Sequence, residues 1–265
     1  PSQFMAGTMS RALDSISDIT KLMDECKAMH IPVLGPDVNE SYLKFGVNHL
    51  GQIRFGLGAI KGVGGSVVEA IISERNAHGP YSSIYDFVER VSPSQINRKA
   101  LECLALAGAF DGFSDICREQ YFGQTGRDTV YLDTLVNYAQ RYHADKAQMQ
   151  QSLFGDTEEI EIAKPIPPAS FTRWTDLERL NKEKDLVGIY ISGHPLDAYQ
   201  VVLRAMCNLK AAQLSELDSN IGKDVTFSGN TGTSQYALDF VAFGKLQFAE
   251  VVVEFHHLCW FKIGG

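Results

Sequence analysis

Five glycines fall within the ten residues from Gly56 to Gly65, and a stretch with apolar residues at helical spacing follows them to Arg75. Glycine adopts left-handed backbone and lets other segments approach closely, so this run restricts the possible folds more than any other part of the sequence. We expect a helix, a tight turn at residues 62–64, and a second helix that opens at Ser66. Ser66 and Glu69 have the spacing of a capping box, which would fix that opening.

The start of this second helix is a candidate phosphate site. Its first backbone N–H groups have no partner within the helix, and the helix dipole favours negative charge there. Glycine at positions 62 and 64 keeps a Cβ from blocking the turn or an approaching phosphate. Such a site contacts the DNA backbone and would bind DNA without sequence preference. The expected phosphate contacts are Lys61, Gly62, Val63, Gly64, Gly65 and Ser66.

The alternative is a glycine-rich packing turn that binds nothing, and residues 62–64 do not distinguish the two possibilities. The charge of the chain does not decide between these two possibilities. The formal net charge is −8, and residues 40–110 carry seven lysines and arginines against six acidic residues. This balance excludes DNA binding through a broad positive field, so any contact with DNA must be local.

The glycine run resembles the helix-hairpin-helix motif, with Ile60 and Val63 as its buried residues. A second pair at residues 97–111 resembles a degenerate partner hairpin. Two hairpins side by side would contact both strands of a duplex. We therefore expect further phosphate contacts from Arg98, Lys99 and Gly108.

The segment at residues 147–170 changes character. It is rich in glutamine, then acidic, and then carries three prolines, so we expect an exposed, extended linker. Within it, Gln150, Ser152, Leu153 and Phe154 resemble the sliding-clamp binding motif of bacterial replication proteins. Gln150 would satisfy a polar rim, and the Leu-Phe pair would fill an apolar pocket. The alternative is that Leu153 and Phe154 pack on a local helix pair.

Helical spacing predicts a mainly α fold. Helices are expected at residues 16–29, with Ser17 as N-cap, and at residues 66–75, 83–90, 97–106, 114–121, 129–146, 175–187 and 196–206. Thr175 and Glu178 have the spacing of a capping box. A short β-hairpin is expected at residues 42–47 and 52–55, and a β segment after residue 224.

The order of these pieces resembles the bacterial DNA polymerase III alpha subunit, a C-family replicative DNA polymerase. The matching blocks are ECKAMHI (25–31), PDVN (36–39), IRFGLGAIKGVG (53–64), KALE (99–102) with AGAFD (107–111), QSLFG (151–155) and SGHPLD (192–197). The resemblance runs from about residue 1 to about residue 229. Beyond residue 229 the sequence departs from the family's OB pattern, and residues 254–265 are foreign to it.

The resemblance implies five regions. They are the C-terminal part of the fingers (1–35), a tandem helix-hairpin-helix duplex-binding domain (36–146), the linker with its clamp motif (147–170), a helical connector (171–222) and a partial OB-like β segment (223–265). It also implies a segment of a DNA-directed DNA polymerase, a nucleotidyltransferase that acts in DNA replication. The catalytic carboxylates would lie outside this sequence, so the segment alone is expected to be inactive.

The partners implied by the resemblance are the template–primer duplex, the β sliding clamp and other subunits of the replicase holoenzyme. No cofactor is expected in the segment, whereas magnesium is implied for the whole polymerase. One rival hypothesis is a free-standing helix-hairpin-helix module of a repair protein, which would bind DNA and no clamp. Another is a helical domain whose glycine turn only packs.

Other candidate chemistry is weaker. His194 precedes a helix start and is expected to order that turn, while His256, His257 and Cys259 lack a fourth ligand at metal-binding spacing. Five scattered cysteines without a C-x-x-C pair indicate reduced thiols. No apolar run approaches the roughly 18 residues of a membrane span. We therefore expect a cytoplasmic segment of a longer chain, with no membrane partner.

Overall fold

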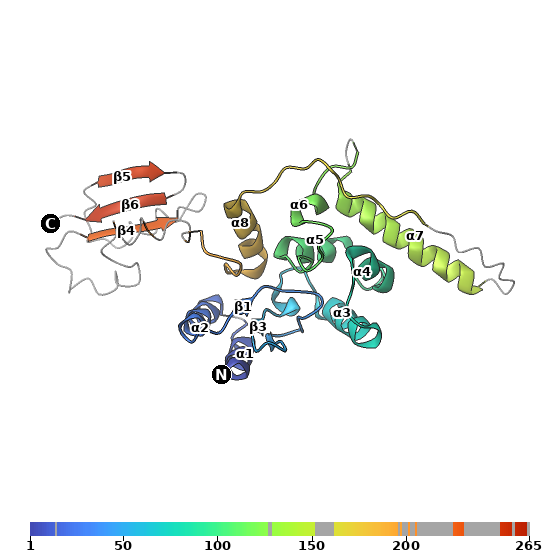
Figure 1. The fold of residues 1–265 in the computed structure, drawn as a ribbon, viewed down its shortest axis with the longest axis horizontal. Coiled ribbons are helices and arrows are strands. Elements are labelled where there is room, and N and C mark those ends of the chain that lie inside the picture. The colour runs from blue at the N-terminus through green and yellow to red at the C-terminus, as the bar shows by residue number, and fades with distance from the viewer. Residues whose placement is uncertain are drawn as a thin grey trace. The chain divides into compact units, whose positions relative to one another are not determined.

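The computed structural model describes residues 1–13, 15–126, 129–151, 162–195, 197, 201, 205, 225–230, 250–255 and 258–263. The chain divides into two compact units, Pro1–Ser192 and Gly193–Gly265. The first unit is mainly helical with one small sheet, and the strands described in the second unit form another (Figure 1). The mainly α fold predicted from the sequence is confirmed.

The first unit opens with two helices and a small sheet. Helices α1 (Ser2–Arg11) and α2 (Ile16–Ala28) precede strands β1 (Val33–Leu34), β2 (Gly46–Val47) and β3 (Ile53–Arg54). The strand order is β1-β3-β2, and β3 runs parallel to β1 and antiparallel to β2. The predicted β-hairpin is confirmed as β2 and β3, although each strand is only two residues long.

The cap of α2 is Ser15, so the prediction of Ser17 was wrong. The Ser15 hydroxyl accepts a hydrogen bond from the Asp18 backbone N–H at 3.3 Å. An N-cap residue needs extended backbone, which Ser15 adopts at φ −122° and ψ 95°. Ser17 lies inside the first helical turn and cannot take that role.

In the described part of the first unit, a short 3-10 turn, η1 (Leu57–Ala59), is followed by six helices. They are α3 (Gly65–His78), α4 (Ile84–Arg90), α5 (Arg98–Ala107), α6 (Arg118–Tyr121), α7 (Tyr131–Gln151) and α8 (Asp176–Val187). The first arm of the glycine hairpin is thus a single 3-10 turn. The capping box of Thr175 and Glu178 at the start of α8 is confirmed.

Two of these helices differ in length from the prediction. The helix expected at residues 114–121 is reduced to α6, because the Gln120 side chain accepts the Cys117 backbone N–H at 3.0 Å and caps the helix there. Helix α7 continues to Gln151 and not only to residue 146. Residues 147–151 contain no glycine or proline that would stop it.

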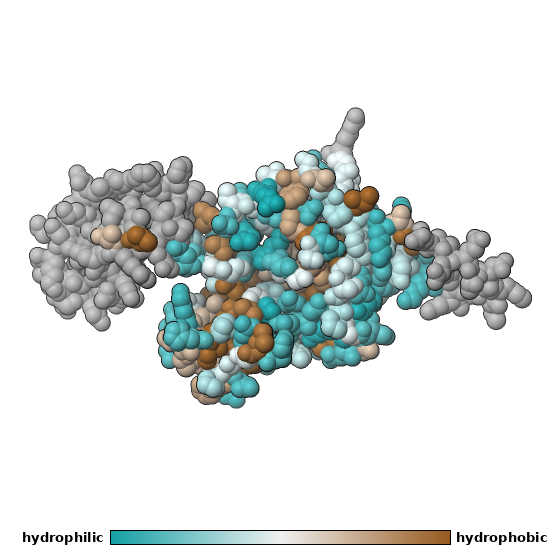
Figure 2. Space-filling model, in the orientation of Figure 1, coloured by the Kyte–Doolittle hydropathy of each residue, from teal (hydrophilic) through white to brown (hydrophobic). Residues whose placement is uncertain are grey.

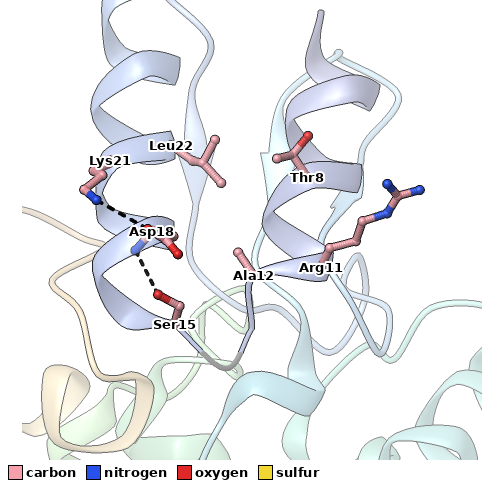
Figure 3. A pocket seen from close by; sticks show the side chains of 7 residues that line it. All are labelled: Thr8, Arg11, Ala12, Ser15, Asp18, Lys21 and Leu22. Atoms are coloured by element: carbon pink, nitrogen blue, oxygen red, sulfur yellow. Dashed lines mark hydrogen bonds and ion pairs between the residues drawn. The ribbon is translucent and has the colours of Figure 1, made fainter.

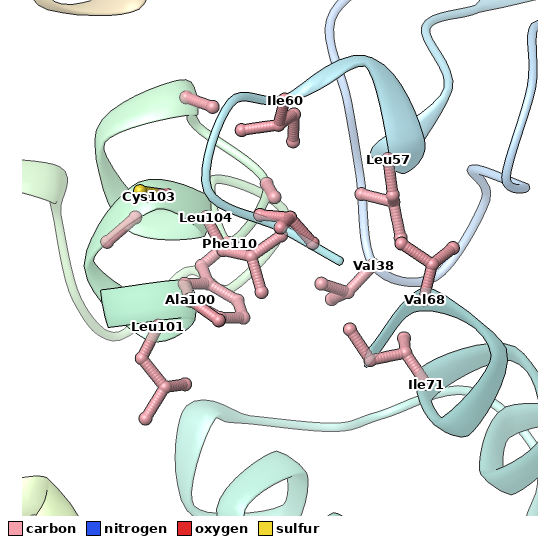
Figure 4. Close-up of a cluster of buried hydrophobic side chains, with 14 of the residues drawn as sticks. Val38, Leu57, Ile60, Val68, Ile71, Ala100, Leu101, Cys103, Leu104 and Phe110 are labelled. Atoms are coloured by element: carbon pink, nitrogen blue, oxygen red, sulfur yellow. The ribbon is translucent and has the colours of Figure 1, made fainter. Parts of the chain in front are cut away.

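One hydrophobic core runs through the first unit, and part of it joins the two hairpin-like pairs. Leu57 and Ile60 from the glycine segment and Val68 from α3 lie across from Leu104 of α5 and Phe110 just after it (Figure 4). All five are at most 2% exposed. Burying a side chain of this size contributes about 1.5–3 kcal/mol. The shared core therefore fixes the glycine segment against α3 and α5.

Gly56 and Gly58 let the glycine segment pass directly against the backbone of residues 43–44. A Cβ at Gly56 would lie 2.6 Å from the carbonyl carbon of Lys44, and one at Gly58 would lie 2.7 Å from the carbonyl oxygen of Leu43. The Gly58 N–H donates to that Leu43 oxygen at 3.0 Å. These two glycines serve close backbone packing.

The second unit contains an antiparallel sheet. Strands β4 (Val225–Asn230), β5 (Glu250–Phe255) and β6 (Leu258–Ile263) are arranged in the order β4-β6-β5. The β segment expected after residue 224 is confirmed by these strands. Most of the helix expected at residues 196–206 lies outside the described residues. No helix within the described ranges has the length and hydropathy to cross a membrane.

Candidate nucleic-acid interface

The turn of the first hairpin packs directly on α5. Gly62 has a φ of +85°, so the expected left-handed backbone is confirmed. A Cβ at this position would lie 2.7 Å from the Cys103 sulfur. Burial raises the pKa of the Cys103 thiol, which keeps this sulfur uncharged beneath the turn. Val63 and Ile60 are buried, as predicted. Gly62 thus serves the contact between the turn and α5.

Helix α3 begins at Gly65, with Gly64 as its N-cap and with no capping side chain. The predicted capping box of Ser66 and Glu69 was therefore wrong. Gly64 has extended backbone, and its carbonyl oxygen already accepts the Val68 N–H at 3.2 Å. This places Ser66 at the second residue of the helix, two residues past the N-cap position.

The start of α3 is open to solvent. Lys61, Gly62, Gly64, Gly65 and Ser66 are all exposed. No atom lies within 4 Å of the place that a Cβ would take at Gly65. The first-turn N–H groups have no acceptor within the helix, and no acidic residue lies in this turn. An anion could therefore approach these N–H groups with the helix dipole in its favour.

Four other helices of the first unit satisfy such N–H groups internally, whereas α1, like α3, has no side-chain cap. A side-chain oxygen of Ser15, Ser83, Asn97 or Thr175 accepts a first-turn N–H of α2, α4, α5 or α8. Helix α3 has two glycines where these helices have a polar cap. Its first turn is therefore available to an external acceptor, as expected of a phosphate site.

The second hairpin-like pair (residues 97–111) is less accessible to a phosphate than the start of α3. Gly108 ends α5 in left-handed backbone, and a Cβ there would lie 1.9 Å from a terminal guanidinium nitrogen of Arg118, which covers it. Arg98 contacts the carboxylates of Asp133 and Glu102. The hydrogen bond to Asp133 raises the pKa of the Arg98 guanidinium. Internal groups therefore already engage Arg98 and cover Gly108, and their phosphate contacts stay predictions.

Lys99 is the most accessible of the residues predicted on the second pair. Its side chain is 67% exposed, and its nitrogen lies 3.6 Å from Glu102. An exposed pair of this kind is weak and can be exchanged for another anion. Lys99 lies one helical turn before Cys103 on α5, on the same face, and Cys103 contacts Gly62. Lys99 is therefore near the turn of the first hairpin (residues 62–64).

The predicted clamp motif falls at the end of α7. The backbone of Gln150 belongs to that helix, whereas Ser152, Leu153 and Phe154 lie outside the described residues. His256 and His257 also lie outside them. Within the described part of the chain, no cluster of three or more His, Cys, Asp or Glu residues could hold a metal ion.

After this interval the chain returns along the first unit as an extended segment, here called the strap (residues 162–174) (Figure 1). The Pro165 carbonyl accepts hydrogen bonds from the Tyr85 and Tyr131 hydroxyls at 2.6 and 3.2 Å. The Pro168 carbonyl accepts one from the Gln120 amide at 3.1 Å. The predicted linker thus contains a packed portion. The domain boundaries stay predictions, and those at residues 36, 147 and 171 fall within the first unit.

Two other surface features lie on the first unit. A shallow groove between α1 and α2 has Leu22 and Thr8 on opposite sides (Figure 3), and it is lined by Arg11 and by Lys21, which pairs with Asp18 at 3.4 Å. On the face seen in Figure 2, hydrophobic residues gather near α1 and α2, where Phe4 is 74% exposed. An apolar surface suits protein contact and offers no donor to a phosphate.

Comparisons with known proteins agree with the hairpin geometry. Residues 30–121 match a family model described as a helix-hairpin-helix motif. The chain is 32% identical to the DNA polymerase III subunit alpha of Xylella fastidiosa over 219 residues, which is 82% of this chain and 18% of that protein. It is 35% identical to the subunit of the same name from Borreliella burgdorferi over 232 residues, 86% of this chain and 19% of that protein.

A third relative extends the match. The DNA polymerase III subunit alpha of Pasteurella multocida is 33% identical over 239 residues, which cover 90% of this chain and 20% of that protein. The chain spans about a fifth of the length of the curated relatives it matches. The similarity includes the glycine turn, the α5 pair and the strap within one continuous segment.

Proposed function

Since the chain belongs to the family of the DNA polymerase III alpha subunits, matching a segment of about a fifth of their length, we propose that it grips duplex DNA for a replicative polymerase. The observation that carries the proposal is the uncapped, exposed start of α3, next to Lys61. Phosphate oxygens would accept hydrogen bonds from the N–H groups of Gly65, Ser66 and Val67. The Lys61 ammonium would add a charge-assisted contact.

The grip would be independent of base sequence, because backbone N–H groups and a lysine contact phosphate and not base edges. This suits an enzyme that must hold template–primer duplex while it moves. Nucleotide transfer itself, with the magnesium ions it needs, is assigned to other parts of the polymerase, and this segment alone is expected to be inactive. We place it in the cytoplasm with the other replicase subunits.

The grip is tested by the salt dependence of duplex binding. A Lys61→Ala, Gly65→Ala double variant is expected to bind a duplex about tenfold more weakly. Its plot of log affinity against log salt, from about 0.05 to 0.2 M, should be flatter by about one unit, because one phosphate contact is lost. The measurement is fluorescence anisotropy with a labelled duplex of arbitrary sequence.

Two observations control this experiment. Gly65 has open space around it, so alanine there should not destabilise the chain. A Lys27→Ala variant removes an exposed charge from α2 and should bind the duplex like the unaltered chain. A double variant with unaltered affinity and slope would contradict a phosphate site at the start of α3.

We also propose that residues 150–154 tether the polymerase to its sliding clamp. Leu153 and Phe154 would each contribute about 1.5–3 kcal/mol by burial in a clamp pocket, before the cost of ordering the peptide. That is a weak contact alone. Combined with DNA held at α3 it becomes effectively intramolecular, and the joint affinity can rise about 10²–10⁴-fold.

A peptide of residues 146–157 is expected to bind a bacterial β sliding clamp saturably in an anisotropy titration. The same peptide with Leu153→Ala and Phe154→Ala should show no saturable binding, because both apolar anchors are gone. If the unaltered peptide fails to bind at any reachable clamp concentration, the tether is excluded and the DNA grip is unaffected.

A further inference from the structure

Helix α8 contacts the glycine turn itself. The Leu186 carbonyl, near the end of α8, accepts the Lys61 backbone N–H at 3.0 Å. Helix α8 also packs along α5, and Val187 and Ile189 enter the common core. Gly188 ends the helix in left-handed backbone, where a Cβ would lie 2.8 Å from an Ile16 side-chain carbon. The end of α8 therefore packs against the turn that carries Lys61.

The same helix carries a buried carboxylate. Glu183 has no exposed surface, and one of its oxygens accepts the Ser192 hydroxyl and lies 3.6 Å from the Arg118 guanidinium. The other oxygen has no hydrogen-bond partner within the described part of the chain. Burying a charge with incomplete pairing costs stability, and an apolar residue would avoid that cost. Core packing alone therefore does not account for Glu183.

Arg118 joins this carboxylate to the second hairpin-like pair. Its guanidinium binds the Asp111 carboxylate at 2.6 Å, donates to the Leu106 carbonyl at 3.4 Å and covers Gly108. Its side chain is only 10% exposed. Through Glu183, α8 is thus connected to the turn after α5.

Glu183 and Leu186 are three residues apart, so they lie on neighbouring positions of one α8 face. That face contacts both hairpin-like pairs: the first through the Lys61 N–H and the second through Arg118. Helix α8 follows the predicted clamp motif in sequence, yet it packs as part of the hairpin region.

We propose that Glu183 is a positioning residue for DNA binding, which rests on the proposed function. Its charge holds Arg118, and this contact fixes α8 against both pairs. The Leu186 carbonyl then holds the Lys61 backbone in the orientation that points the turn and the α3 start toward the same phosphates. Loss of the charge lets α8 shift, and the turn no longer presents Lys61 together with the α3 N–H groups.

The test is a Glu183→Gln variant of the full chain. Glutamine keeps the volume and a hydrogen bond to Ser192 but lacks the charge that Arg118 requires. We expect duplex affinity to fall about fivefold and the salt slope to flatten by about one unit, because one phosphate contact is lost. Amide hydrogen exchange at Lys61 should become about tenfold faster, while exchange at Val68 and Ile71 in α3 stays unchanged.

Asp185→Asn is the matched control. It removes one negative charge from an exposed position of the same helix, two residues away, and should leave the salt slope and the Lys61 exchange rate unaltered. A stoichiometric titration gives the fraction of active protein. A merely structural role for Glu183 would lower that fraction without changing the slope.

Two outcomes would overturn the proposal: an unchanged salt slope in Glu183→Gln, or exchange that accelerates equally at Lys61, Val68 and Ile71, which would indicate general destabilisation. The proposed function is tested independently of Glu183, with the unaltered chain. If that chain shows no salt-dependent duplex binding, the grip itself is wrong, whatever the variant does.

Discussion

A Gly56→Ala variant is expected to lose about 3 kcal/mol of unfolding free energy. The new methyl group would lie within 2.8 Å of three backbone atoms in residues 43–44, and backbone cannot swing aside as the end of a side chain can. Moving the segments apart would weaken the hydrogen bonds that the Leu57 and Gly58 N–H groups donate at 2.8 and 3.0 Å. Urea unfolding followed by far-UV circular dichroism measures the loss.

Gly7→Ala is the control for this substitution. Gly7 lies within α1 with no atom within 4 Å of its Cβ position, so alanine there should raise the unfolding free energy by about 0.5–1 kcal/mol. The sign of the effect should therefore differ between the two glycines. A Gly56→Ala variant as stable as the unaltered chain would contradict the close backbone packing that supports the glycine turn.

An Arg118→Met variant is expected to lose about 3–5 kcal/mol of unfolding free energy, because it leaves the Glu183 carboxylate buried without its charged partner. Asp111 also loses its partner, but its side chain is 46% exposed and water can solvate it. The unpaired Glu183 carboxylate therefore accounts for most of the loss in unfolding free energy. Urea unfolding at neutral pH gives the value.

The double variant Arg118→Met, Glu183→Met isolates that cause. Replacing a buried ion pair by apolar side chains of similar size is often neutral or stabilising, so most of the lost stability should return. If the double variant is as unstable as Arg118→Met, the loss comes from the contacts of Arg118 with Asp111 and Leu106, and the Glu183 pair contributes little.

Features that depend on neighbouring residues could be predicted from the sequence. The capping box of Thr175 and Glu178 needs only two side chains three residues apart, and it is present. The left-handed turn at Gly62 also follows from local chemistry. The start of α3 could not be placed in the same way, because Gly64 and Ser66 are both acceptable N-cap residues. The extended backbone of Gly64 decides between them.

Features that depend on distant residues could not be predicted. The contact of Gly62 with Cys103 and the hydrogen bonds of Tyr85 and Tyr131 to Pro165 join parts of the chain that no local pattern connects. The same limit applies to the candidate site. Lys61 and Gly65 are exposed, whereas the Asp133 partner of Arg98 comes from α7 and was not foreseen.

The strap has a mechanical consequence. A force applied to the chain between Gln151 and Ile162 would be transmitted to the first unit through two segments. One is α7, which packs on α4, α5 and α6, and the other is the strap, held at its Pro165 and Pro168 carbonyls. Neither path passes through Gly193–Gly265. Tension applied there would thus be shared between two anchors, α7 and the strap, within the first unit.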